Sequence, residues 1–205
     1  VGFVDGCQNL ENILLDSDNP YLKIVDGVLY NSNLTVLIKC PFSQSITDLD
    51  IPDSVEMLLS SCCAGNTYLN HVTLPDNLKR IEGSAFYGCT YLSCDLDFPD
   101  GMEYIGPTAF YWCKALAGEL QFPDSLEMIN TWAFDGCTQL TGNVIFPESL
   151  KAANDPFPGC VNLSGTLYIP SSLEAWGNGN GGEYFSEYCV SENNPVFCSD
   201  NGVLY

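Results

Sequence analysis

The chain has 205 residues, which is enough for one domain with a substantial core, and its apolar content of 46% argues against disorder. Its 26 acidic and six basic side chains give a net charge of −20, and such a surface would repel nucleic acid and anionic membranes. Cationic proteins, neutral glycans and divalent cations remain open as partners. No run of about 18 apolar residues is present, so we expect no membrane insertion in this segment.

Two similar segments stand near the ends of the chain, NPYLKIVDGVLY at 19–30 and NPVFCSDNGVLY at 194–205. Asp26-Gly27 separates two apolar stretches of the first segment, and an Asp-Gly pair in this setting is typical of a tight hairpin turn. Asn201-Gly202 stands at the equivalent place in the second segment. We therefore expect hairpin-like insertions near 19–30 and 194–205.

Between these segments, prolines recur every 23 or 24 residues, at Pro52, Pro75, Pro99, Pro123, Pro147 and Pro170. Alternating apolar residues lead into each proline, as at Leu96 and Phe98 or Leu120 and Phe122, and this period of two predicts a short strand. A second apolar segment follows, and in three of the six units an Ala-Phe pair comes after it. Because one unit cannot bury its apolar residues alone, we predict a single repeat solenoid over residues 1–205. It should have about seven coils, rich in short strands and turns with little helix.

One unit carries the fullest version of the pattern, with Leu69, Val72, Leu74, Pro75, Leu78, Ile81, Ala85, Phe86 and Cys89. This unit resembles the BspA-like leucine-rich repeats of bacterial and protist surface proteins. Phe3, Gly6, Cys7 and Leu10 resemble the tail of a truncated repeat, so we expect both ends to lie within a longer array. The resemblance weakens at Cys62-Cys63 and Pro156-Phe157, which replace Ala-Phe, and in a glycine-rich stretch at 177–185.

The resemblance implies a right-handed leucine-rich-repeat superhelix that is extracellular, at the surface of a bacterial cell. It also implies recognition or adhesion without catalytic activity. The expected partner of this monomeric module is a host matrix protein, a cell-surface protein or a glycan. A structural spacer that displays other domains is the alternative.

Four of the 11 cysteines repeat at one position of the unit, Cys89, Cys113, Cys137 and Cys160. A zinc site needs ligands that converge and a disulfide needs thiols that face each other, whereas a linear column places its side chains in parallel. We predict buried, unpaired thiols that bond weakly to turn carbonyls. Free thiols in a surface protein indicate an anaerobic or reducing niche such as the gut. A disulfide between Cys189 and Cys198 remains open.

The candidate binding surface consists of outward positions four and two residues before each proline. In a stacked sheet these positions become two adjacent stripes, acidic at one end and neutral at the other. A basic partner or Ca²⁺ would relieve repulsion between the carboxylates, although a solvated face that only keeps the protein soluble fits the same pattern. The candidate ligand-binding residues are Asp48, Asp50, His71, Asp95, Asp97, Glu119, Gln121, Asn143 and Tyr168.

Other chemistry has little support in the sequence. No phosphate-binding loop, metal-binding motif or Ser-His-Asp set is present, so we expect no cofactor, no resident metal and no catalytic site. His71, the only histidine, stands one column from Cys94, and this pair is what a thiol enzyme would need. Four aromatic residues after the Ala-Phe pairs either form a second contact surface or pack against the next coil: Tyr87, Tyr91, Tyr111 and Trp112.

Overall fold

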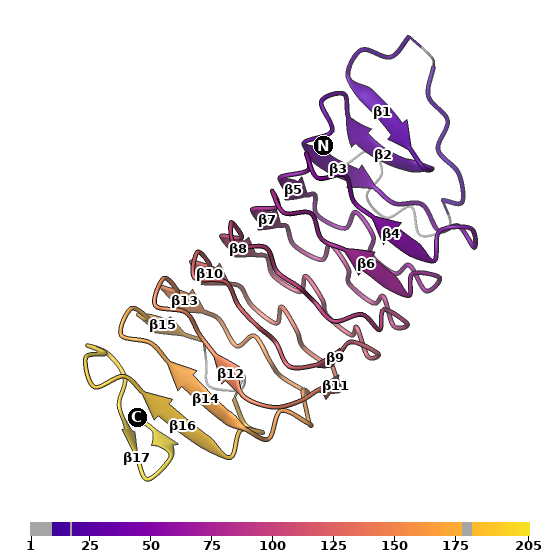
Figure 1. Cartoon of the computed structure of the whole chain (residues 1–205). Coiled ribbons are helices and arrows are strands. Elements are labelled where there is room, and N and C mark those ends of the chain that lie inside the picture. The colour runs from indigo at the N-terminus through magenta and orange to yellow at the C-terminus, as the bar shows by residue number, and fades with distance from the viewer. Residues whose placement is uncertain (1–9, 17, 178–181) are drawn as a thin grey trace.

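The chain forms a β-solenoid in which successive coils stack into an elongated rod (Figure 1). The computed structural model describes residues 10–16, 18–177 and 182–205. No helix is present in these residues, and the predicted fold class is confirmed. Three residues of the predicted truncated repeat, Phe3, Gly6 and Cys7, lie outside the described residues, as does the middle of the glycine-rich stretch, 178–181.

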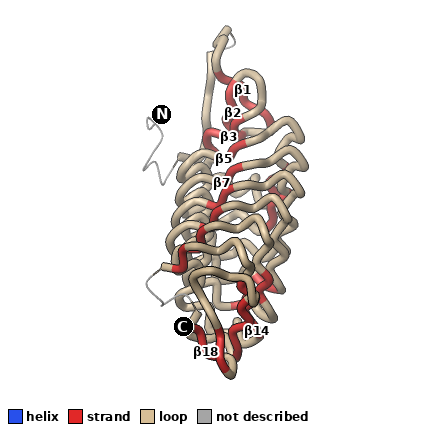
Figure 2. Tube along the Cα trace, turned by 90° about the vertical axis from the view of Figure 1, so that its left-hand side faces the viewer, coloured by secondary structure: helices blue, strands red, loops and turns tan. Residues whose placement is uncertain are grey.

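The most continuous sheet lies along one side of the rod and is built largely from segments that follow the prolines (Figures 1 and 2). We call its parallel strands the post-proline row. Each strand comes from a different coil, and neighbouring strands pair in parallel from the first to the last. The row consists of β3 (Val36–Lys39), β5 (Met57–Leu58), β7 (Arg80–Ile81), β8 (Tyr104–Ile105), β10 (Met128–Ile129), β13 (Ala152–Ala153) and β15 (Ala175–Trp176).

The two-residue strands of this row are stabilised because one side chain of each points into the core. The second residue is fully buried at Leu58, Ile81 and Ile105, whereas the first, as at Arg80, is partly exposed. Burying each Leu or Ile contributes about 1.5–3 kcal/mol. The prolines close the turn before the strand, where for example the N–H of Leu78 donates to the carbonyl of Pro75 at 3.0 Å. Segments this short show no period, so the sequence did not identify them as the main sheet.

A second set of strands, which we call the pre-proline row, lies on another side of the rod (Figure 1). This row is interrupted, because β4 and β6 form one sheet and β12, β14 and β16 form another. The strands predicted at 96–98 and 120–122 are reduced to single parallel bridges, Asp97 with Gln121 and Gln121 with Ile145. The strands of the row are β4 (Asp48–Asp50), β6 (His71–Thr73), β12 (Val144–Ile145), β14 (Thr166–Ile169) and β16 (Glu187–Val190). A small separate sheet pairs β9 (Ala117–Gly118) with β11 (Gln139–Leu140).

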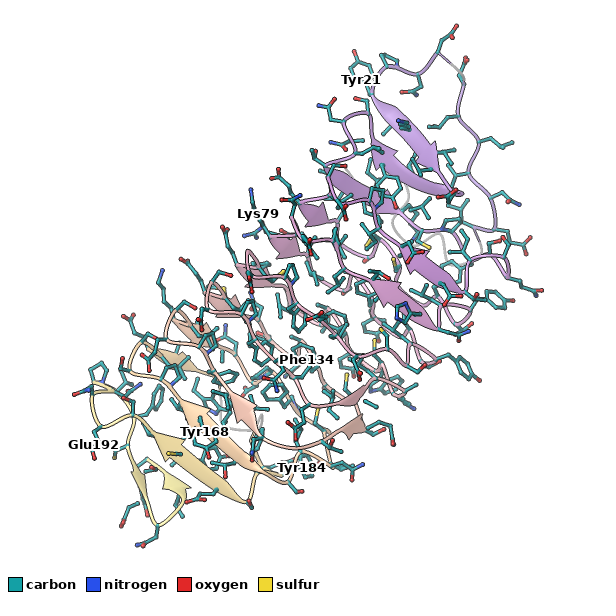
Figure 3. The ribbon with its side chains drawn as sticks, viewed as in Figure 1. Tyr21, Lys79, Phe134, Tyr168, Tyr184 and Glu192 are labelled. Atoms are coloured by element: carbon teal, nitrogen blue, oxygen red, sulfur yellow. The ribbon has the colours of Figure 1, made fainter. Side chains whose placement is uncertain are left out.

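The core between the two rows consists of columns in which each coil repeats the side chain of the coil before it. Phe86, Phe110, Phe134 and Phe157 stack with ring centroids 5.2, 5.2 and 5.7 Å apart, and none of them is more than 1% exposed. Phe134 lies inside the rod in Figure 3. Each aromatic pair of this kind contributes about 0.5–1.5 kcal/mol beyond the burial of its surface. These columns hold each coil to its neighbours.

The cysteine column confirms the prediction of buried, unpaired thiols. Its four members are fully buried, and their Sγ atoms donate to backbone carbonyls of the preceding coil at 3.0–3.2 Å. Burial raises the pKa of all four thiols, and that of Cys160 reaches about 12. All ten cysteines in the part of the chain that the structure describes are free, and Cys189 and Cys198 are exposed.

Two antiparallel hairpins accompany the parallel rows. β1 (Leu22–Val25) and β2 (Val28–Asn31) meet at Asp26-Gly27, whose φ angles are 48° and 81°. β17 (Ser199–Asp200) and β18 (Val203–Leu204) meet at Asn201-Gly202, whose φ angles are 50° and 79°. Positive φ at both central residues is typical of a type I′ turn. Because β2 also pairs with β3, the first hairpin extends the post-proline row.

Candidate recognition surface

The nine predicted binding residues are exposed and lie along the pre-proline row, where the interruption divides them into two groups. In the first group, Asp48 lies opposite His71, and Asp50 lies opposite Thr73. In the second group, a line of paired positions crosses successive coils through Asp97, Gln121 and Ile145 and reaches Tyr168 of β14. Tyr168 is labelled in Figure 3. Two residues before members of this line stand Asp95, Glu119 and Asn143. The structure therefore shows two groups with a gap between them.

A groove opens at this gap, between β6 and segment 95–97 of the next coil. Its volume is about 700 Å³, and its lining includes His71, Thr73, Asp76, Asp95, Asp97, Phe98 and Asp100. No backbone pairing joins 71–73 to 95–97, both of which the structure describes. The two coils stay in contact beside the groove, where the N–H of Ser93 donates to the carbonyl of Asn70 at 2.9 Å. The groove is thus a local separation of two strands.

The residue five positions before the proline differs between this coil and the coils that follow. It is a glycine in the three coils that follow, Gly118, Gly142 and Gly165, but it is Cys94 in this coil. A Cβ at Gly118 would lie 3.0 Å from Oδ1 of Asp95, so the glycine makes room for the outward side chain of the preceding coil. Cys94 carries that Cβ, and its side chain is buried. The change from glycine to Cys94 thus coincides with the place where β6 is not paired with the next segment.

The two rows also differ in how their charges are neutralised. The ion pairs of the described residues lie beside the post-proline row, with N–O distances of 2.9–3.1 Å, in Lys79–Glu56, Arg80–Glu82 and Lys151–Glu127. In the same described part of the chain, the candidate carboxylates of the pre-proline row form no ion pair. Asp50 accepts a hydrogen bond from Oγ1 of Thr73 at 2.9 Å. This donor is neutral, so the negative charge of the surface remains.

The sequence left open whether Ca²⁺ neutralises these carboxylates. Among residues 10–16, 18–177 and 182–205, no group of three or more His, Cys, Asp or Glu side chains is arranged to hold a metal ion. His71 and Thr73 stand between the aspartates of β4 and those of 95–97, and Gln121 stands opposite Asp97. This spacing lowers the repulsion that like charges on paired strands would cause. It suits a long cationic side chain, which needs only one or two carboxylates, better than a divalent cation.

His71 and Cys94 are not arranged as a nucleophile and its base. Cys94 is buried, and burial raises the pKa of its thiol although the thiol bonds the backbone of Val72. His71 is exposed on β6, and no hydrogen bond joins the two side chains, both of which lie in the described part of the chain. A raised thiol pKa lowers the fraction of reactive thiolate. The pair therefore offers no support for a thiol enzyme.

The aromatic turns pack against the next coil and also remain accessible. The rings of Tyr87 and Tyr111 are parallel with centroids 4.9 Å apart, and Tyr111 stacks on Trp112 at 5.4 Å. Tyr87 and Trp112 nevertheless keep 41% and 47% of their surface exposed. These aromatic residues therefore both pack against the next coil and offer an exposed contact surface, since stacking leaves part of each ring in contact with solvent.

The family comes from a comparison with models of known protein families. The model described as BspA type leucine rich repeat region matches residues 39–164 and 103–180, and the match contains six copies of the repeat. The chain belongs to the BspA-type leucine-rich-repeat family. Repeat proteins of this kind present long surfaces that serve protein recognition. In the described residues of this BspA-type chain, no helix is long and apolar enough to cross a membrane. No curated protein matches the chain.

Solved bacterial leucine-rich-repeat structures share the fold of this BspA-type chain. A leucine-rich repeat protein from Eubacterium ventriosum has a TM-score of 0.73 at 22% identity, over 100% of this chain and 59% of its own. A leucine rich cell surface protein from Faecalibacterium prausnitzii has a TM-score of 0.68 at 21% identity, over 93% and 59%. The pneumococcal vaccine antigen PcpA has 0.68 at 18%, over 89% and 50%. This chain thus spans between half and three fifths of these proteins, and such identities show the fold alone.

Proposed function

We propose that this BspA-type chain is a recognition module on the surface of a bacterial cell that binds a basic segment of a host matrix or cell-surface protein. The groove between β6 and 95–97 carries the proposal, because it combines a volume of about 700 Å³ with aspartates that form no ion pair in the described residues. Two structural relatives are described as a cell surface protein and a vaccine antigen, which supports an exposed location. The module has no catalytic role in this proposal.

The groove offers carboxylates from two directions to a Lys or Arg side chain. Asp95 and Asp97 come from the strand segment of one wall, whereas Asp76 and Asp100 come from turns after the prolines. Hydrogen bonds between a cationic donor and a carboxylate are shorter than neutral ones and roughly twice as strong. The acidic row would also steer a basic partner and speed its association, an effect that salt screens.

A glycan is the second candidate partner, and the neutral end of the same row favours it. Ile145 and Tyr168 are 59% and 39% exposed at paired positions of neighbouring coils. Gln121 and Asn143 stand beside them and supply amide donors and acceptors. A flat tyrosine ring flanked by amides can contact a sugar ring and bond its hydroxyls. Recognition of this kind would depend little on salt, unlike binding through the groove.

Binding to immobilised fibronectin, fibrinogen and laminin and to a glycan panel, measured across a salt series, tests the proposal. We expect saturable binding to a matrix protein that weakens as salt rises. Asp95→Lys combined with Asp97→Lys should weaken it by about tenfold or more, because removing buried or clustered charge pairs at an interface costs several kcal/mol. The matched control is Glu103→Lys with Asp124→Lys, outside the groove. Each change adds two charges, so both double variants go from a net charge of −20 to −16.

Equal losses in the two double variants would show that net charge governs binding, and the groove would then have no special role. Salt-independent binding to a glycan that survives Asp95→Lys with Asp97→Lys would move the site to the neutral end of the row. A complete absence of binding across the panel would favour the structural spacer.

A further inference from the structure

Three buried thiols lie together in the coils that carry β3 and β5, those of Cys40, Cys62 and Cys63, and all three residues are 0% exposed. The Sγ atoms of Cys62 and Cys63 are 3.8 Å apart, and the thiol of Cys40 lies close enough to that of Cys63 for each to shift the pKa of the other. Asn66, buried beside them, donates from Nδ2 to Sγ of Cys40 at 3.7 Å. This cluster shares no residue with the groove and has no part in the proposed function.

Cys40 and Cys63 occupy equivalent positions in neighbouring coils. The N–H of Cys40 donates to the carbonyl of Cys62 at 2.9 Å, and the N–H of Cys63 donates to the carbonyl of Ala85 at 2.8 Å. In each bond the acceptor is the residue just before the paired position of the next coil. Cys40 is therefore paired with Cys63, and Cys63 with Phe86, so the three residues belong to one column. Paired strands place such Cα atoms about 4.8 Å apart, which lies within the range of about 4.4–6.8 Å found in disulfides.

Cys62 and Cys63 are less suited to a disulfide with each other. They are adjacent in sequence, and consecutive Cα atoms lie about 3.8 Å apart, below the usual disulfide range. Closing a bond between them would therefore require the backbone to distort. Of the three thiols, Cys40 and Cys63 form the pair whose Cα separation lies in the disulfide range. Because their side chains leave the column in the same direction, the two thiols must rotate towards each other to bond.

These thiols also differ from the four thiols of the cysteine column. Each column thiol donates to a backbone carbonyl at 3.0–3.2 Å. In the cluster the contacts with carbonyls are longer, 3.7 Å from Sγ of Cys40 to Pro41 and 3.9 Å from Sγ of Cys62 to Ala85. The column thiols are thus held by short bonds to the backbone, whereas the clustered thiols bond the backbone at longer distances and Cys62 also contacts the thiol of Cys63.

A buried cation stands beside the cluster. Lys39 is 3% exposed, and its Nζ donates to the carbonyl of Ser61 at 2.9 Å, with no ion pair to a carboxylate in the described residues. The neighbouring Cys63 thiol lowers the pKa of Cys40, with smaller help from Asn66 and Lys39 and against the opposing effect of burial. The Cys40 thiol in turn raises the pKa of Cys63. The thiolate is the nucleophile in disulfide exchange, so Cys40 is the attacking group.

We propose that Cys40 and Cys63 are a redox-active dithiol that reacts with low-molecular-weight disulfides and closes into a reversible disulfide between two coils. The Cys40 thiolate attacks one sulfur of the small disulfide, whose S–S bond breaks as one half leaves as a thiolate. Cys63 then loses its proton to solvent and attacks Sγ of Cys40, and the second half leaves as a thiolate. The protein dithiol loses two electrons and two protons, and the small disulfide is reduced to two thiols.

The burial of the three thiols sets the rate of this reaction. A small disulfide reaches them only when the coils that carry β3 and β5 open locally, and such openings cost less than global unfolding. The reaction is therefore slow in the native protein, and denaturant below the unfolding transition speeds it. The exposed thiols of Cys189 and Cys198 react without this opening.

Peptide mapping of the whole chain after incubation with oxidised glutathione tests the proposal. The reaction is quenched in acid, and the chain is then unfolded in denaturant so that its free thiols can be blocked with N-ethylmaleimide near neutral pH. The unreduced chain is digested and analysed by mass spectrometry. The expected product is a peptide in which Cys40 and Cys63 are joined, with the loss of two alkylatable thiols that dithiothreitol restores. The column cysteines Cys113, Cys137 and Cys160 should remain alkylated. Cys62 and Cys63 fall in the same peptide, so the wild-type map is repeated with Cys62→Ser. This variant should give the same product, which would show that Cys63 and not Cys62 forms the bridge.

Two variants resolve the order of steps. Cys63→Ser should accumulate a mixed disulfide of glutathione on Cys40, whereas Cys40→Ser should form neither the mixed disulfide nor the bridge. Modification restricted to Cys189 and Cys198 in the wild-type chain, or a bridge that joins a column cysteine as often as Cys63, would overturn the proposal. The wild-type map alone decides this point, so the outcome does not depend on the folding of any variant.

Discussion

The two rows of this solenoid come from the same repeat, yet one is continuous and the other is broken. In the post-proline row, paired strands run from β3 to β15 and ion pairs connect neighbouring coils at Lys79–Glu56 and Lys151–Glu127. In the pre-proline row, pairing stops between β6 and 95–97, and the carboxylates there form no ion pair in the described residues. The coils stay stacked where one row is unpaired, so we infer that the buried columns hold them together and leave the outward positions of that row free to vary.

If the columns hold both rows, their loss should have the largest effect on stability. Phe110 is 0% exposed and stacks on Phe86 and Phe134 at 5.2 Å. Phe110→Ala is expected to lower the free energy of unfolding by about 3–5 kcal/mol, measured by urea unfolding followed by circular dichroism. The control Ile145→Ala removes an exposed side chain of the pre-proline row and should change it by only about 0.5 kcal/mol. Similar losses in both variants would contradict the central role of the columns.

High pH should weaken the columns through the buried thiols. Burial raises the pKa of Cys160 to about 12, so the folded chain keeps this proton where the unfolded chain, with a thiol pKa of about 8.5, loses it. The contribution to stability is complete below about pH 8.5 and is lost as the pH rises towards the folded value. We expect Cys160 alone to lower the free energy of unfolding by up to about 1.4 kcal/mol per pH unit above about pH 9. Urea midpoints across this range measure the fall, and Cys160→Ala should make it shallower by this amount, because Cys89, Cys113 and Cys137 still contribute. A wild-type midpoint that stays constant would contradict this role of the thiol.

The ion pairs that distinguish the post-proline row should contribute least. The side chains of Lys151 and Glu127 are 61% and 57% exposed and lie 3.1 Å apart. Exposed pairs of this kind contribute about 0.2–1 kcal/mol, and salt screens them. Lys151→Ala should therefore lower the free energy of unfolding by less than about 1 kcal/mol at low salt and by almost nothing at high salt. A loss comparable to that of Phe110→Ala would mean that charge, and not the columns, holds the coils together.

The features that recur from coil to coil could be predicted from the sequence, whereas the groove and the thiol cluster, which occur once, could not. The proline spacing and the apolar positions repeat strictly, so the solenoid, its core columns and the buried cysteines with carbonyl partners could be derived from them. The outward positions of the candidate residues also followed from the period of two, as Asp97 and Tyr168 show by their exposure. These features depend on local pattern and on stacking, and both are visible in the sequence.

The groove could not be predicted from the repeat pattern, because it depends on whether 71–73 pairs with 95–97 in one particular pair of coils. The signal was present at Cys94, which replaces the glycine found in the next three coils. Its meaning became clear only when the structure showed that this glycine makes room for a neighbouring side chain, as Gly118 does for Asp95. The thiol cluster was missed for a similar reason, since Cys40 and Cys63 are 23 positions apart and meet only through the register of the coils.

The substitution Cys94→Gly tests most directly whether the break in the pre-proline row creates the recognition site. It restores the glycine column, so 71–73 should pair with 95–97 and the amides of these segments should exchange with deuterium more slowly. Binding of this variant to the matrix protein that the wild type recognises is the decisive measurement. We predict that affinity falls by about tenfold or more while the fold is retained, because closing the groove removes the space for a cationic side chain. Slower exchange with unchanged affinity would contradict the account, since binding would then not need the groove.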